Sequence, residues 1–220
     1  VPAVEACKTQ TIDVGETHLP RSGAEGDLPQ IAVTTGSADS LECLLRELGI
    51  ADTEFTNPSG PGRVHLYSGR RAGQGGRGTS NGSAIDANTP SANALWDDLA
   101  ELKKHDIVVL SCEGNENMAT KSRAALQNML AYANAGGRIF ASHYHYVWID
   151  GDSPFPPTGL YGTGREADGD FSVDTSFPKG SAFAEWLVSV GASLRAGVVP
   201  LRNVRSSGSQ LVPPPQQWVH

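Results

Sequence analysis

The sequence predicts an α/β fold in three layers, with a mainly parallel, doubly wound sheet between helices. The segments 30–36 and 106–111 are short, apolar and rich in β-branched residues, as strands buried on both faces are. Each is followed by apolar residues at helical spacing, and strand and helix alternate at least three times along the chain. Such alternation favours parallel strands joined by right-handed crossovers, with helices on both faces of the sheet.

Each expected element follows from a local pattern. The strand at 30–36 is followed by leucines at helical spacing, which end at Gly49. Val64 and Leu66 alternate with other residues, which indicates a strand, and Ser91 is a favourable helix cap. In chain order we expect a strand at 30–36, a helix at 41–48, a strand at 62–67, a helix carrying Leu95, Leu99 and Leu102, a strand at 106–111, a helix at 120–135, a strand at 138–142, a helix carrying Phe183, Trp186, Leu187 and Val190, and a strand at 196–200.

The chain is expected to form one α/β domain over residues 30–205. Residues 1–29 show no sustained periodicity beyond a possible strand at 9–14, so we interpret them as an arm or as the end of an upstream domain. Residues 68–90 are rich in Gly, Ser and Asn with almost no large apolar side chain, which predicts a mobile surface loop. Residues 206–220 are read as a C-terminal tail.

Composition argues against two classes of partner. The 220 residues are 39% hydrophobic and 19% charged, with a net charge of −7 at pH 7. This acidic balance argues against nucleic acid or an anionic membrane surface as the principal partner. No apolar run reaches the roughly 18 residues of a spanning helix, so we expect no membrane span. The first residues lack the succession of a signal peptide, and we read the chain as mature protein.

Residues that can carry chemistry follow three of the expected strands. In open α/β sheets the ligand site lies beyond the carboxyl ends of the strands. Gly36 ends the first strand, Cys112 and Glu113 follow the strand at 106–111, and two histidines and three aromatic residues occupy 143–148. We therefore predict one cleft with His143 and Glu113 as catalytic residues and with Gly36, Cys112, Tyr144, His145 and Trp148 as ligand-binding residues.

Three readings of the histidines stay open at this point. If the strand at 138–142 continued, His143 and His145 would share a face and could hold a divalent metal, although no third ligand is singled out. The pair could instead line a polar ligand pocket, without any cofactor, or be a structural hydrogen-bonded pair. Cys112 could also act as a nucleophile with His143 as its base, but it lacks a tight Gly-x-Cys-x-Gly turn.

A disulfide between Cys7 and Cys43 is a further expectation. On the helix at 41–48 the leucine stripe faces the sheet, so Cys43 points outward. The arm that carries Cys7 is the segment available to cover that face, and exposed free thiols are a liability in secreted proteins, which a bridge would remove.

Over residues 31 to about 148 the chain resembles the class I glutamine amidotransferase-like superfamily, in particular its ThuA-like branch. The resemblance is carried by Asp106–Leu110, by Leu130–Gly137 and by the strand that runs into Ser142 and His143. The segments 39–46 and 140–145 also look like parts of secreted or lipoprotein-type proteins of deltaproteobacteria. The resemblance implies a flavodoxin-like, class I amidotransferase-like sheet and an extracellular, periplasmic or outer-membrane-associated protein.

The chain departs from that family at the nucleophile. His143 stands where true amidotransferases carry their cysteine, and His145 stands at the second glycine of the motif, so we expect no glutaminase activity. ThuA-like proteins also carry His here and are linked to carbohydrates. The first hypothesis is therefore an extracytoplasmic binding module for a carbohydrate or similar polar ligand. The alternatives are a hydrolase that uses His143 with Glu113 or a metal, and a structural domain of a larger surface protein with neighbouring domains or chains as partners.

Overall fold

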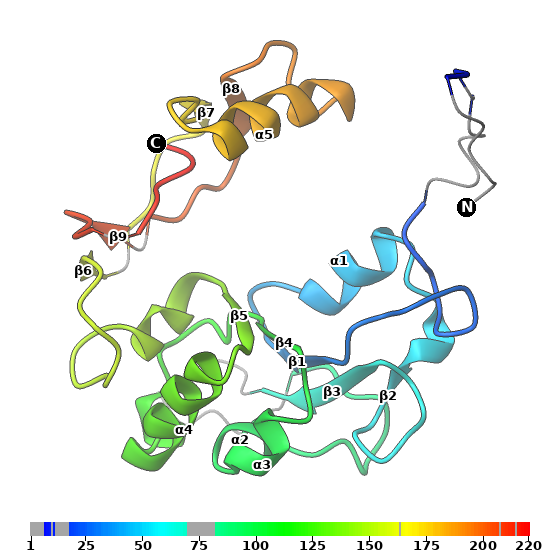
Figure 1. Cartoon of the computed structure of the whole chain (residues 1–220). Helices are drawn as coiled ribbons and strands as arrows, with labels where there is room; N and C mark the ends of the chain where they lie inside the picture. Colours follow the sequence, from blue (N-terminus) through cyan, green and yellow to red (C-terminus); the bar gives the residue numbers. More distant parts are fainter. Residues whose placement is uncertain are drawn as a thin grey trace.

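The computed structural model describes residues 7–9, 11, 18–69, 82–162, 164–206, 208–213 and 215–220. Within this part of the chain, five parallel strands form one sheet in the order β2-β3-β1-β4-β5 (Figure 1). The strands are β1 (Ile31–Thr35), β2 (Phe55–Thr56), β3 (Val64–Ser68), β4 (Ile107–Leu110) and β5 (Arg138–Ala141). The predicted α/β fold with a parallel sheet is confirmed, and its finer assignment as flavodoxin-like stays a prediction.

Helices cover both faces of this sheet. Alternate residues of each strand point to opposite faces, so Ala32 and Val108 pack toward one set of helices, and Val33 and Val109 toward α1 (Leu41–Glu47). The face to which Ala32 and Val108 point is covered by α2 (Asn93–Trp96), α3 (Leu99–Leu102) and α4 (Arg123–Asn134). Three short 3₁₀ helices complete this part: η2 (Asp52–Glu54), η3 (Met118–Thr120) and η4 (His143–Trp148).

Three details of the expected helices are wrong. Leu44 on α1 and Leu48 directly after it are exposed, and only Leu41 and Leu45 pack toward the sheet. Ser91 does not cap a helix but forms an isolated bridge with Ser68. The single helix expected after it is two short ones, and the second is capped by the Asp98 carboxylate, which accepts from the Ala100 amide.

The strand expected at 138–142 is β5, which pairs only with β4 and so forms one edge of the sheet, where Phe140 is 55% exposed. The helix expected at 120–135 is confirmed as α4, which starts after Ser122, whose hydroxyl accepts from the Ala125 amide.

The C-terminal segments form two small antiparallel ribbons outside the parallel sheet. β6 (Leu160–Tyr161) pairs with β9 (Gly208–Ser209), and β7 (Gly169–Ser172) pairs with β8 (Val198–Leu201). The expected helix around Phe183 is α5 (Pro178–Ser189), which packs on β7 and β8 in an apolar cluster of its own. The end of the chain returns to this cluster, since the His220 amide donates to the Ser172 carbonyl at 2.9 Å.

The expected Cys7–Cys43 disulfide is absent: both thiols are free and exposed. The physical reason is the path of the arm. The Arg21 carbonyl accepts from the Ala51 amide and the Gly23 amide donates to Glu54, so the described part of the arm lies beyond the C-terminal end of α1.

Parts of two expectations fall outside the described residues. The possible strand at 9–14 is described only at residues 9 and 11, and the glycine-rich loop at 68–90 is undescribed over 70–81. The described end of that loop is held to the sheet, because the Thr35 hydroxyl donates to the Ser83 carbonyl.

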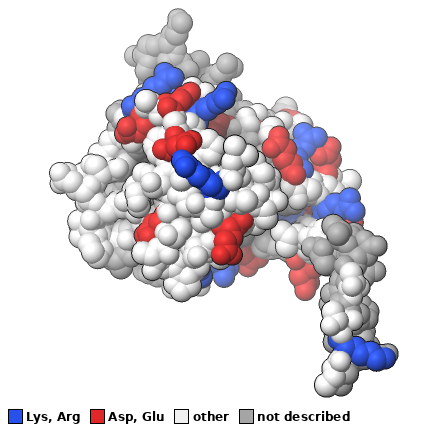
Figure 2. Space-filling model, turned by 90° about the horizontal axis from the view of Figure 1, so that it is seen from above, with Lys and Arg blue, Asp and Glu red and all other residues white. Residues whose placement is uncertain are grey.

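The described surface mixes both signs of charge. On the face shown in Figure 2, basic and acidic side chains are interspersed rather than gathered in one basic patch. No helix in the described ranges is both long and apolar enough to cross a membrane.

Candidate functional site

Three strand ends meet at one edge of the sheet, as predicted. β1, β4 and β5 are neighbours and run parallel, so the residues after them lie side by side. Asp39, from the turn after β1, ties the three together: its carboxylate accepts hydrogen bonds from the Cys112 amide and from the Ser142 hydroxyl. Sequence reasoning missed Asp39, although its position in the first turn after a strand was a usable signal.

Gly36 serves the close packing of these turns. A β-carbon on this residue would lie 2.1 Å from the Cys112 carbonyl oxygen, far inside contact distance. The same oxygen accepts from the amides of Ser37 and Ala38 at 3.1 and 3.0 Å. Gly36 therefore positions Cys112 through the backbone, and it is absent from the side chains that line the cleft.

Cys112 and His143 are brought together across β4 and β5. The Cys112 Sγ lies 3.4 Å from Nδ1 of His143 and accepts from the Gly114 amide at 3.3 Å. Burial raises the pKa of the Cys112 thiol, and the nearby carboxylates of Asp39 and Glu113 add to the rise. The backbone amides of Tyr144 and Gly114 act in the opposite direction, because they stabilise negative charge on sulfur.

His143 sits in a strained backbone conformation between a strand and a helix. Its φ of 38° lies in the left-handed region, which non-glycine residues adopt rarely. The ring packs against Tyr144 at a centroid distance of 4.1 Å. Burial lowers the pKa of His143, and the positive charge of Arg205 lowers it further, while Asp39 raises it. Its Nε2 is buried without a hydrogen-bond partner among the described residues.

A cavity of about 470 Å³ opens over these groups, and we call it the Cys112 cleft. It is lined by Ala38, Asp39, Cys112, Gly114, His143, Tyr144, Asn203 and Arg205. Asn203 and Arg205 come from the segment between β8 and β9, far from the strand ends in sequence. No motif marks these two residues, so sequence reasoning could not nominate them.

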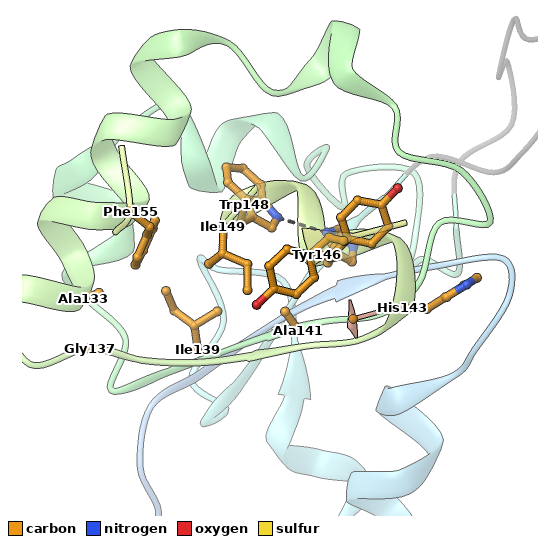
Figure 3. Close-up of a pocket in the computed structure, with 12 residues that line it drawn as sticks. Ala133, Gly137, Ile139, Ala141, His143, Tyr146, Trp148, Ile149 and Phe155 are labelled. Carbon is orange, nitrogen blue, oxygen red and sulfur yellow. Dashed lines mark hydrogen bonds between the residues drawn. The ribbon is translucent and has the colours of Figure 1, made fainter. Parts of the chain in front are cut away.

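His145 lies in the interior instead of the cleft. Its Nδ1 accepts from the Trp148 indole at 3.0 Å, the dashed bond in Figure 3, so its Nε2 carries the proton and donates to the Ser111 carbonyl at 2.9 Å. Burial lowers the pKa of His145 to about 4, and Lys121 contributes. The imidazole is therefore neutral at pH 7, with both nitrogens occupied.

The metal reading of His143 and His145 does not fit this geometry. β5 ends at Ala141 and the chain turns into η4, so the two residues do not share a face as they would on a strand. Within the described ranges, no group of three or more His, Cys, Asp and Glu side chains is placed to hold a metal ion.

Glu113 also points away from the cleft. It lies at the same sheet edge as His143, but its carboxylate accepts from Lys121 Nζ at 2.8 Å, and both side chains are 1% exposed. Lys121 Nζ further donates to the Glu116 carbonyl and lies 5.4 Å from the Trp96 ring centroid. The expected catalytic carboxylate is one half of a buried ion pair.

The aromatic residues after β5 divide between two cavities. Tyr144 lines the Cys112 cleft, whereas Tyr146 and Trp148 line a separate apolar cavity of about 520 Å³ beside β5. Figure 3 shows Tyr146, Ile149 and Phe155 around this cavity, with the His143 ring directed away from it. Trp148 is 2% exposed, so it is a core residue and does not present a face to the cleft.

Comparison with known proteins finds no relative of this chain. No family model matches the chain, and neither does any curated protein or any solved structure. The resemblance to the ThuA-like branch therefore stays a prediction, and function has to be argued from the cleft itself.

Proposed function

We propose that the chain is a binding module whose Cys112 cleft takes a small polar ligand with an acidic group, most simply a sugar acid. The observation that carries the proposal is the position of Arg205 over the three strand ends. Arg205 makes no hydrogen bond or ion pair with the described residues, yet it lines a polar cavity at the edge where α/β sheets bind ligands. A guanidinium so placed suits a carboxylate, which it can bind through two parallel hydrogen bonds.

The remaining lining residues suit the rest of such a ligand. The Tyr144 ring offers an aromatic surface for the apolar side of a sugar ring. Asn203 offers its amide N–H groups to hydroxyl oxygens, while its Oδ1 accepts from Arg165 at 3.3 Å. The Asp39 carboxylate is already hydrogen-bonded to Cys112 and Ser142, so it opposes an anionic ligand less than an unengaged acid would.

The backbone at His143 supports the amidotransferase-like interpretation of the fold. A residue at positive φ between a strand and a helix is the arrangement that presents a nucleophile in α/β hydrolytic enzymes. Here that position carries an imidazole, which fits binding better than glutamine hydrolysis. The proposed extracytoplasmic location rests on the resemblance to secreted and lipoprotein-type proteins alone.

Calorimetric titration with glucuronate, galacturonate and uncharged glucose tests this proposal. We expect the uronates to bind more tightly than glucose, and Arg205→Gln to weaken uronate binding by about tenfold or more, because a charge-assisted pair is lost. Arg202→Gln is the matched control, an exposed arginine of the same segment outside the cleft. Equal binding by both variants, or by glucose and the uronates, would contradict the proposal.

The hydrolase alternative in its original form loses its support. Glu113 is bound to Lys121, and the two histidines do not converge, so neither a Glu113 base nor a metal at His143 and His145 fits the geometry. The structural-domain alternative predicts that no uronate or sugar binds, which the same titration measures.

A further inference from the structure

We propose that Cys112 is a nucleophile and His143 its general base, and that the Cys112 cleft cleaves esters of acids that carry a second carboxylate. The inference rests on the proposed function, because the same cleft and the same Arg205 would hold the substrate. In α/β hydrolytic enzymes the strained strand-to-helix turn presents the nucleophile. Here the turn after β5 presents the imidazole instead, and the sulfur comes from the end of the neighbouring strand β4.

The geometry of the pair carries the argument. The distance of 3.4 Å between Cys112 Sγ and His143 Nδ1 is that of a thiol donating to an unprotonated ring nitrogen. That contact places the ring proton on Nε2, the nitrogen that is buried without a partner among the described residues. The strand-to-helix turn and the packing of Tyr144 hold the ring in this position.

The surroundings of the sulfur fit proton transfer during attack. Because burial raises the pKa of Cys112, the thiol is protonated at pH 7 and needs a base. Because burial lowers the pKa of His143, its imidazole is in the basic form at that pH. The backbone amides of Gly114 and Tyr144 then stabilise the charge that develops on sulfur as the proton leaves.

The reaction balances with water as the only co-reactant. Sγ forms a bond to the ester carbonyl carbon as its proton moves to Nδ1 of His143, and the carbon–oxygen bond to the alcohol breaks. The leaving alkoxide takes the proton from His143, which leaves a thioester on Cys112. A water molecule then gives a proton to His143 and attacks the thioester, which releases the acid and restores the thiol as the proton returns to sulfur.

The test uses two nitrophenyl esters and a chain without the exposed thiols. Cys7→Ser/Cys43→Ser is the background, since those two free cysteines would react without any site. The probes are 4-nitrophenyl acetate and mono-4-nitrophenyl succinate. The succinyl group is one methylene longer and carries a second carboxylate, which also assists loss of nitrophenolate in water, so the rate without protein is subtracted. We expect a burst of one nitrophenolate per chain, a succinyl group on the peptide that contains Cys112, and about a tenfold preference for the succinate ester that Arg205→Gln removes.

Substitutions of the pair give the deciding readouts. Cys112→Ser and Cys112→Ala should both lose the burst, and two variants guard against a folding defect in one of them. His143→Asn, which tolerates the left-handed backbone, should slow acylation by about 10²-fold or more. With His143 present, the acylation rate should be independent of pH between the pKa of His143 and the pKa of Cys112. In His143→Asn the acylation rate should rise steadily with pH as the Cys112 thiolate forms.

The two proposals fail separately. Uronate binding without a burst at Cys112 would overturn the nucleophile and leave the binding module standing. A burst at Cys112 without uronate binding would overturn the binding module and leave the nucleophile standing. An unchanged burst in Cys112→Ser, or the same pH profile with and without His143, would also overturn the assignment of the pair.

Discussion

Cys112 and Glu113 are adjacent in sequence, yet Cys112 lines the cleft and Glu113 lies in the interior. His143 and His145, two residues apart, are separated in the same way. Cys112 and His143 meet at the wall of the cleft, where Nε2 of His143 is buried without a partner among the described residues. Glu113 and His145 lie in the interior, the first paired with Lys121 and the second bonded through both ring nitrogens. Residue type alone therefore does not separate a reactive group from a structural one at this sheet edge.

The interior and the cleft differ in whether their polar groups have hydrogen-bond partners. The interior side places an acid, a lysine and an imidazole in fixed contacts, as buried polar groups require. The cleft side keeps a strained backbone at His143 and an unpartnered nitrogen, features that persist at functional sites because the surrounding fold holds them. The comparison predicts that substitutions on the interior side affect stability and those on the cleft side affect chemistry.

The largest effect on stability is expected from Glu113→Gln. The change removes the carboxylate partner of an ammonium group that is 1% exposed, and breaking a buried pair in this way costs about 3–5 kcal/mol. Urea denaturation measures the loss. Replacing both partners, as in Glu113→Gln/Lys121→Met, should recover part of it. A change below about 1 kcal/mol in the single variant would mean that the ion pair is not structural.

A smaller, pH-dependent effect is expected at His145. Its pKa is lowered to about 4 by burial, against 6.5 for the exposed group, so the unfolded chain binds the extra proton between these values. This contribution to stability is complete above about pH 6.5 and is lost as the pH falls toward 4, by on the order of 3 kcal/mol.

Denaturation from pH 7 to pH 4 checks this sign. The acid loss should be shallower in His145→Gln, which cannot titrate, than in the wild type. Parallel acid profiles for His145→Gln and the wild type would rule out His145 as the source.

The smallest effect on stability is expected from His143→Gly. Glycine adopts a φ of 38° without steric cost, which offsets the lost packing on Tyr144, so the free energy of unfolding should stay within about 1 kcal/mol of the wild type. The same variant should lose ester cleavage. Destabilisation comparable to that of Glu113→Gln would place His143 on the structural side of the comparison.

Sequence reasoning reaches the sheet and its edge because their signals are local. The apolar runs that became β1 and β4 and the apolar stripe of α4 are set by periodicity, and parallel pairing brings the strand ends together. The sequence could not predict which side chains of residues 143–148 face the cleft and which face the interior. That arrangement depends on β5 ending at Ala141 and on the positive φ at His143. Arg205 depends on the path of a distant segment, which no local pattern records.

The most direct test of this division is an NMR titration of the imidazole nitrogens of His143 and His145 from pH 5 to pH 8, in the wild type and in Cys112→Ser. We expect the His145 signals to stay those of a neutral ring with the proton on Nε2 throughout, and to be the same in both proteins. The His143 signals should respond to pH at the acid end and should shift when the thiol is replaced. Titration of His145 near its ordinary pKa, or His143 signals that ignore Cys112→Ser, would contradict the account.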